Sequence, residues 1–593
     1  MSAHRPGLPA GPGQAGGADP GRRGPVHQGG VGGGGDAVTG EASTDEAPER
    51  ADVEPRAFPA VTHAEELVAA VRQRSVDLFA SVEAVDDHLV RAQGIEGLLG
   101  DALEVLRDKM GLDELLAVTV VDRTDLGEGL EVVHHMGPQA GGIVLELATP
   151  FPPEEGSDGI QSTSVPSSVS HWRSAEWLER EAWEMSGVAF AGHPGLRRLL
   201  LPRWWVGHPM RRDDARQRTV GLEDPHETPG DKEMEAEGFV PVSLAAAPMG
   251  GRLGLAIRTK DGRVTGARVS AGHLHRGVEG LLEDRTYEAC LPVVARASVR
   301  SSVHWQVAYA EAVEALCHVE VPSRGRQLRV AMMELERVAD HMLAHAATLD
   351  ALGCPAAASR VWADRELVMD ASQAVTGQRL VQDAIAVGGV ARDAPGEWSG
   401  RLLGVARAVQ AMVKQYVREA EALEPMARLE GLARVNLEDM TGWGLTGPLL
   451  RAAGVPRDAR ADGRCRAYRD LQVTVLTRDG GDALARSKLR LLEMASSART
   501  LAQVARTLSG GRSHAAMPET VPKGVGLGVV ETPTGELLCM VASDGTPRPR
   551  RVRLRGPDAA HTAALADLVL GCRVEDVGLA AVSVDISVGG CDR

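Results

Sequence analysis

The spacing of the cysteine and glycine residues decides which metal, redox and phosphate sites are possible. The seven cysteines include no two spaced as Cys-x-x-Cys, so paired thiolates are not predicted. Most are expected to be small buried hydrophobic residues in a reducing compartment. The glycine run at 32–35 lacks a flanking strand and helix, and we interpret it as linker rather than as a phosphate-binding loop.

Length and composition describe a multidomain globular protein. The 593 residues exceed the roughly 100–200 residues of one domain. An aromatic fraction of 3% requires cores built mostly from Leu, Val, Ala and Met. A formal net charge of -16 argues against general nucleic-acid binding, which needs clustered Lys and Arg. No apolar stretch reaches the length of about 20 residues that spans a bilayer, and no secretory pattern begins the sequence. The chain is expected in the cytoplasm.

The hydrophobic pattern divides the chain into four segments. Residues 1–60 are rich in Gly, Pro and acidic residues and predict a disordered extension. Residues 61–214 mix helix-like and strand-like periodicity and predict a small α+β domain. A charged segment with several helix breakers at 215–237 predicts a linker. Residues 238–593 are expected to form a second, larger domain.

The second domain is predicted to be mainly helical with small sheets at its periphery, so the chain as a whole is α+β. The segment 331–345 places Met332, Leu335, Val338 and Met342 on one helical face. The remaining predicted elements are helices at 96–109, 364–381, 401–423 and 484–508, strands at 115–122 and 142–147, a hairpin of 253–259 with 263–269, and strand-like segments over 527–593.

The segment RSAEWLEREAWEMSGVAFAGHPGLRRLLLPRWWVGHPMRRD, residues 173–213, has an unusually specific order of features. A helix with Trp177 and Glu181 runs into Gly187, and a Gly-His-Pro-x-Leu-Arg-Arg-x-Leu stretch and a second Gly-His-Pro follow. This order resembles the small core subunit of the peripheral arm of complex I. As single side chains, the charged residues also fit a solvated amphipathic helix, and the resemblance depends on their combination.

Four further blocks and the last ten residues resemble the large core subunit of complex I, which is homologous to the large subunit of membrane-bound [NiFe] hydrogenases. The terminal VDISVGGCDR fits the final motif of that family. Fusion of both parts in one chain also occurs in some bacterial complex I enzymes and in the large subunit of formate hydrogenlyase. The four blocks are residues 272–316, 365–393, 444–462 and 530–558.

In the hydrogenases, four thiolates in two Cys-x-x-Cys pairs bind nickel and iron, to which soft deprotonated sulfur is suited. The first pair matches Ser298 and Ser301 here, and the second matches Ser587 and Gly590, with Cys591 one residue out of register. A serine hydroxyl cannot replace a bridging thiolate at neutral pH. The resemblance therefore predicts no nickel–iron centre and argues against hydrogen activation.

Complex I also lacks these cysteines and holds a quinone headgroup in the equivalent cavity, beside an iron–sulfur cluster of a neighbouring subunit. The resemblance therefore implies quinone as the ligand, at a site that includes Ser298, Val299 and Ser301. Two expected headgroup donors are missing from the sequence. The His-Pro loop of the family matches residues 244–251, which contain no histidine, and its tyrosine matches Val299.

Other polar residues are candidates near the same site. Arg276, which follows His275, matches the arginine near the cluster of complex I, where a fixed cation favours the reduced state. The acidic partner in the family is best matched by Asp350, one position out of register, so this residue is either functional or at the surface. His304 is either a replacement polar group at the cavity or a histidine satisfied in the core. Three charged residues are expected to form buried pairs that support the fold: Glu334, Arg337 and Arg365.

The resemblance implies a core subunit that passes electrons from an iron–sulfur cluster in a partner to a quinone and couples this transfer to ion translocation. NADH would bind elsewhere in the complex. The expected partners are a small cluster-bearing subunit, antiporter-like membrane subunits and a quinone-channel membrane subunit, which would attach the chain to the inner face of the cell membrane. An alternative is a non-redox coupling or structural subunit, and a hydrogenase is a third hypothesis.

Overall fold

The computed structural model describes residues 63–152, 163–203, 205–212, 237–244, 250–437 and 442–593. The predicted extension at 1–60 lies outside these residues, as does the predicted linker apart from Glu237. All of the described residues belong to one compact unit, Phe58–Arg593. The predicted division between 61–214 and 238–593 stays a prediction.

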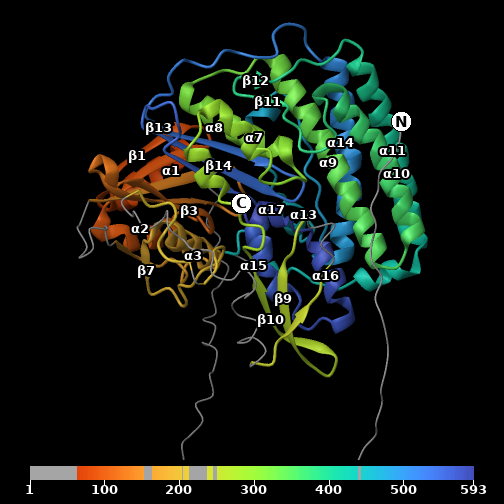
Figure 1. The fold of residues 1–593 in the computed structure, drawn as a ribbon, viewed down its shortest axis with the longest axis horizontal. Coiled ribbons are helices and arrows are strands. Elements are labelled where there is room, and N and C mark those ends of the chain that lie inside the picture. The colour runs from red at the N-terminus through yellow and green to blue at the C-terminus, as the bar shows by residue number, and fades with distance from the viewer. Residues whose placement is uncertain (1–62, 153–162, 204, 213–236, 245–249, 438–441) are drawn as a thin grey trace, which may run out of the picture. The chain divides into compact units, whose positions relative to one another are not determined.

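The segment from 63 to 212 is built on a five-stranded sheet in the order β1-β2-β5-β4-β3 (Figure 1). β2 and β5 are parallel, and all other neighbours are antiparallel. β3 (Glu114–Arg123) is an almost continuous apolar run because helices cover one face of the sheet and strands of the large part cover the other. The other elements are α1 (Ala64–Ser75), β1 (Phe79–Asp86), β2 (Leu89–Gly94), α2 (Leu99–Asp108), β4 (Gly129–Gly137), β5 (Val144–Phe151), β6 (Ser164–Pro166), α3 (Ala175–Ser186) and β7 (Ala189–Ala191).

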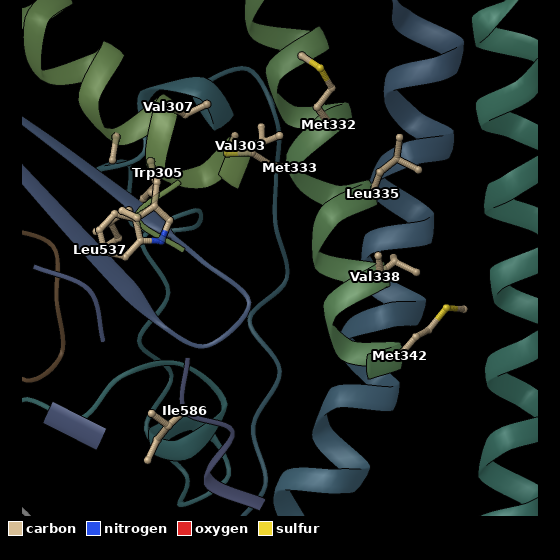
Figure 2. Packing of buried hydrophobic residues seen from close by; sticks show 14 of the residues in the cluster. Val303, Trp305, Val307, Met332, Met333, Leu335, Val338, Met342, Leu537 and Ile586 are labelled. Carbon is tan, nitrogen blue, oxygen red and sulfur yellow. The ribbon is translucent and has the colours of Figure 1, made fainter. Parts of the chain in front are cut away.

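Long helices form the body of the large part, with α9, α10, α11 and α14 running side by side (Figure 1). α9 is buried along most of its length, and the predicted apolar face of Met332, Leu335, Val338 and Met342 is confirmed as core. Figure 2 shows these four side chains along one side of the helix. The long helices are α8 (Ser302–Cys317), α9 (Ser323–Ala351), α10 (Pro355–Thr376), α11 (Trp398–Ala422) and α14 (Ala483–Thr507).

A three-stranded sheet of β13 (Gly524–Glu531), β14 (Glu536–Ser543) and β15 (Arg551–Arg555) lies between the two parts. One side of it packs on the five-stranded sheet, and α8 packs closely on β13. Gly528 allows this approach, because a Cβ there would overlap the carbonyl oxygen of Ala308. The sheet therefore fixes the position of α8, whose first turn carries much of the candidate site.

The predicted hairpin is confirmed as β9 (Gly254–Lys260) and β10 (Arg263–Ser270), joined at Asp261 and Gly262, both with positive φ. The prediction of strand-like structure over 527–593 was wrong after Arg555, where the alanine-rich sequence forms helices. These are α15 (Asp558–Leu568), α16 (Val577–Val584) and α17 (Val588–Cys591). The remaining short elements are β8 (Val240–Val242), α6 (Val278–Glu283), α7 (Tyr287–Val294), β11 (Ile385–Ala386), β12 (Gly389–Val390) and α13 (Gly447–Arg451).

Candidate functional site

Three serines from two distant segments meet at a buried point between the start of α8 and the start of α17. The hydroxyl oxygens of Ser298 and Ser587 lie 3.0 Å apart, and Ser301 donates to Ser298 at 3.3 Å. The indole N–H of Trp305 donates to the Ser301 hydroxyl at 3.1 Å. All three serines are buried. We call Ser298, Ser301 and Ser587 the serine cluster.

The residues around the serine cluster do not fit a nickel–iron centre. A Cβ at Gly590 would overlap a carboxylate oxygen of Asp558, so a fourth ligand side chain there would require the Asp558 side chain to move. Burial raises the pKa of the neighbouring Cys591 thiol well above its usual range. Neutral hydroxyls and a protonated thiol are poor substitutes for the thiolates that bind such metals.

Charged groups are buried close to the serine cluster. Arg300 donates to both oxygens of Asp340 at 2.7 and 2.8 Å and pairs with Asp585 at 2.7 Å. Burial opposes the charge of Arg300, but the two aspartates hold its pKa above the ordinary value. Burial raises the pKa of Asp558 to about 7, although it accepts a 2.8 Å hydrogen bond from the Ser587 amide. Because Asp340 and Asp585 both pair with Arg300, its charge is already neutralised within the chain.

Arg276 lies beside the segment that leads into Ser298. Its guanidinium donates to the carbonyl oxygens of Arg296 and Ala297 at 2.9 and 3.1 Å. Burial lowers the pKa of Arg276, and Asp592 opposes this shift. The Nδ1 atom of the preceding His275 lies 3.1 Å from the backbone oxygen of Asp592. Arg276 and His275 thus connect the loop before α6 to two segments of the site.

Val299 is 47% exposed, which is unusual for a large apolar side chain next to a buried cluster. A Cβ at Gly250 would lie 3.7 Å from the Val299 Cγ2 atom, so the loop matched to the family's His-Pro loop ends beside Val299. Of the matched loop, only its ends are described, because residues 245–249 lie outside the described part of the chain.

A small cavity opens next to Val299, with about 20 Å³ available to the centre of a water molecule. This is room for roughly one water. Glu336 lines this cavity, and it accepts from the Ser302 hydroxyl at 2.9 Å and has one oxygen 2.7 Å from Nδ1 of His304. The cavity is lined by Val299, Arg300, Glu336, Ala339, Arg365, Met369, Ser372, Arg379, Leu380, Val381 and Gln382.

Asp350 is exposed near the end of α9. Fourteen residues separate it from Glu336 along the helix, which corresponds to about 20 Å. The functional role predicted for Asp350 stays a prediction, but the residue is not brought to the serine cluster. The expected pair of Glu334 and Arg337 is present at 3.7 Å with both side chains buried, whereas Arg365 donates to the Ala339 carbonyl at 2.9 Å.

The sequence interpretation missed Glu336, Asp340 and Asp558. Glu336 and Asp340 stand four residues apart on α9, within a segment otherwise interpreted by its apolar face. Two acidic residues four positions apart in a buried helix are a signal that the sequence does contain. Buried charges need partners, so such a pair predicts a polar site in the core. Asp558 had no comparable signal, since its contact with Ser587 depends on the tertiary fold.

Two families match the two parts of the chain. The family described as respiratory-chain NADH dehydrogenase, 30 Kd subunit, matches residues 96–220. The family described as respiratory-chain NADH dehydrogenase, 49 Kd subunit, matches residues 352–523 and 516–593. The chain is a fusion of these two subunit families. The serine pair at 298 and 301 precedes the matched range of the 49 Kd family.

Relatives with the same fusion extend the match over that range. The C/D subunit of NADH-quinone oxidoreductase from Gluconacetobacter diazotrophicus is 27% identical over 542 residues, which cover 83% of this chain and 88% of the relative. The protein of the same name from Nitrosospira multiformis is 28% identical over 478 residues, covering 72% of this chain and 78% of the relative. The fused chain therefore resembles these relatives in its arrangement as well as in its parts.

The fold is also found in a solved structure. A chain of the membrane-bound sulfane sulfur reductase, described as an archaeal respiratory membrane complex, is 28% identical, with a TM-score of 0.56. The match covers 62% of this chain and all of that chain. The large part thus has the hydrogenase-related large-subunit fold. Among the described residues, no helix is both long and apolar enough to span a membrane.

Proposed function

We propose that the chain is a core subunit of a membrane-associated NADH-quinone oxidoreductase-like complex, in which it helps to pass electrons from a partner's iron–sulfur cluster to a quinone and couples this step to ion translocation. The observation that carries the proposal is the similarity, over most of the chain, to relatives named as the C/D subunit of NADH-quinone oxidoreductase. In this proposal the chain attaches to the inner face of the cell membrane through membrane subunits.

The residues around Val299 support a site at the boundary with a partner. The exposed Val299 side chain and Gly250 offer an apolar wall for a quinone ring, and Arg276 supplies a fixed cation nearby. A fixed cation favours the reduced, more negative state of a neighbouring cluster. Val299 cannot donate a hydrogen bond, so the headgroup donors would have to come from the partner.

A second candidate is a non-redox coupling subunit. The cavity next to Val299 admits roughly one water, and Arg300 is fully engaged by Asp340 and Asp585. A subunit that transmits conformational change needs a tightly packed interior here rather than a headgroup pocket. In this second candidate function, the chain has the same partner subunits but no quinone acceptor.

The two candidates are separated by isolating the complex from native membranes through an affinity tag on this chain and measuring quinol formation with a soluble quinone. The first candidate predicts quinone reduction that falls at least several-fold in Arg276→Ala. The same variant should lower the reduction potential of the partner's cluster, measured by redox titration with electron paramagnetic resonance. Arg285→Ala is a matched control, since Arg285 is a half-buried arginine whose side chain donates to the nearby Leu281 carbonyl.

Intact complex with no quinone reduction would contradict the first candidate and favour the second. Equal rates and potentials in Arg276→Ala and Arg285→Ala would remove Arg276 from the site. Stoichiometric nickel in the purified complex would overturn both candidates in favour of a hydrogenase.

A further inference from the structure

Glu336 is hydrogen-bonded to the start of α8 and also faces the cavity. Its carboxylate accepts from the amides of Val303 at 3.1 Å and His304 at 3.3 Å and from the Ser302 hydroxyl at 2.9 Å. The side chain remains 8% exposed and lines the cavity next to Val299. Water in the cavity can therefore reach a carboxyl group that is otherwise enclosed by protein.

His304 continues this contact into the protein. Its Nδ1 atom lies 2.7 Å from a Glu336 oxygen, a distance at which a proton is shared directly. Its Nε2 atom is fully buried and has no hydrogen-bond partner among the described residues. A buried nitrogen without a partner is costly, and such groups occur where strain or proton transfer has a use. The two ring nitrogens thus have different environments.

A buried ion network lies close to His304. The charges that act on the His304 ring include those of Arg337, Glu334 and Arg460. Glu334 lies 3.1 Å from Arg460 and 3.7 Å from Arg337, and all three side chains are almost completely buried. The Tyr468 hydroxyl donates to Glu334 at 2.5 Å. His304 therefore contacts a carboxyl group at the cavity wall and is also close to an interior ion network.

We propose that Glu336 and His304 form a two-residue proton relay between water in the cavity and the interior of the large part. With the carboxylate ionised, the neutral ring holds its proton on Nδ1 and donates it to Glu336. When a proton arrives at Nε2 from the interior, the Nδ1 proton passes to the carboxylate, and the resulting carboxylic acid releases it to cavity water. One proton enters, one leaves, and no electron is transferred.

The electrostatics of the pair agree with this sequence of states. Burial raises the pKa of Glu336 to about 7, although the hydrogen bonds from the Val303 amide and the Ser302 hydroxyl favour the carboxylate. Burial holds the pKa of His304 well below its usual range, so the ring stays neutral while the carboxyl titrates. The charged groups around Glu336 from neighbouring elements are Arg300 before α8, Arg365 in α10, Arg379 after α10 and Asp340 on α9 itself.

The relay is tested first in the purified full-length chain, without any quinone. Infrared titration between pH 5 and 9 should detect carboxyl groups that titrate near neutrality, among them Asp558. One of these signals should be lost in Glu336→Gln and kept in Asp350→Asn, the exposed acid on the same helix. With ¹⁵N-labelled histidine, the His304 ring, assigned by its loss in His304→Gln, should change from the Nδ1–H to the Nε2–H tautomer in step with this carboxyl. In Glu336→Gln that change with pH should disappear.

Ser302→Ala gives an independent variant that keeps both relay groups. It removes a hydrogen bond to the carboxylate, so the Glu336 titration should move to higher pH with the tautomer change following it. The relay would be overturned if the Glu336 carboxyl did not titrate between pH 6 and 8. It would also be overturned if Glu336 titrated while the His304 tautomer stayed the same. The inference rests on the proposed function for its use in the complex. A working relay in a complex without quinone reduction would support the relay and refute only the proposed acceptor.

Discussion

The contact between the two parts of the chain and the wall of the cavity both bury charged side chains, but with different degrees of pairing. At the contact, Glu279 lies 2.6 Å from Arg551 and 3.1 Å from Arg593, and Arg593 also reaches Glu181 on α3 at 2.8 Å. At the cavity, Glu336 receives hydrogen bonds from neutral groups, and one nitrogen of His304 has no partner among the described residues.

The difference separates a structural use of buried charge from a functional one. Glu181, which lies between Arg553 and Arg593, has a lowered pKa and keeps its charge across the physiological pH range. A carboxyl group enclosed by neutral groups changes its ionisation near neutrality. Only the second kind can exchange protons during turnover, and the first kind holds the two parts together.

The largest expected effect is at the contact between the two parts. Glu279→Ala removes one partner of Arg551, of Arg593 and of the Leu554 amide, and leaves fewer carboxylates to oppose the buried guanidinium groups. We expect a loss of about 3–5 kcal/mol in the free energy of unfolding, measured by urea denaturation of the full-length chain. Glu575→Ala, which breaks an exposed pair with Arg573, is the control and should cost less than about 1 kcal/mol. Similar losses in both variants would contradict a locked contact.

The second prediction concerns pH at the cavity wall. Because the folded pKa of Glu336 is raised from 4.5 to about 7, its contribution to stability is fully present below pH 4.5 and is lost as pH rises through 7. Between pH 5 and 8, the free energy of unfolding of the wild type should therefore fall by up to about 3 kcal/mol more than that of Glu336→Gln. Parallel stability curves for the two proteins would show that Glu336 is already ionised at pH 5.

The same contrast explains how far the sequence predicts the molecule. The apolar period of α9 and the turn at Asp261 and Gly262 are local signals, and the structure confirms both. The resemblance also identifies Ser298, Ser301 and Ser587 as one site from matched motifs alone. These features depend on spacing along the chain or on motifs shared with a family.

The residues that were missed depend on long-range packing. Glu336 gains its properties because α8 begins directly beside it, and no pattern within α9 contains that information. Asp558 meets Ser587 only because α15 and α17 pack together. Asp350 is a near match to a family position, and register along a helix decides its place, since a shift of a few residues moves a side chain from the core to the surface.

The third prediction tests the serine cluster, which contains neither a paired buried charge nor a buried carboxyl group. Ser301→Ala removes the acceptor of the buried Trp305 indole N–H without creating a charge. An unsatisfied buried donor costs about 1–3 kcal/mol, and we expect a loss in that range by urea denaturation. Ser301→Thr keeps the hydroxyl and serves as the control. An unchanged stability in Ser301→Ala would indicate that water replaces the lost acceptor.

The smallest effect is expected at Asp350. This residue tests the contrast with an exposed acid instead of a buried one. This carboxylate is exposed in the last turn of α9, where the negative end of the helix dipole disfavours an anion. Asp350→Asn should therefore be neutral or more stable by up to about 0.5 kcal/mol. Its rate of quinone reduction in the complex should also be unchanged. A clear loss of rate with unchanged stability would mean that a partner protein lies over this end of α9 and gives an exposed acid the environment that the chain alone gives to Glu336.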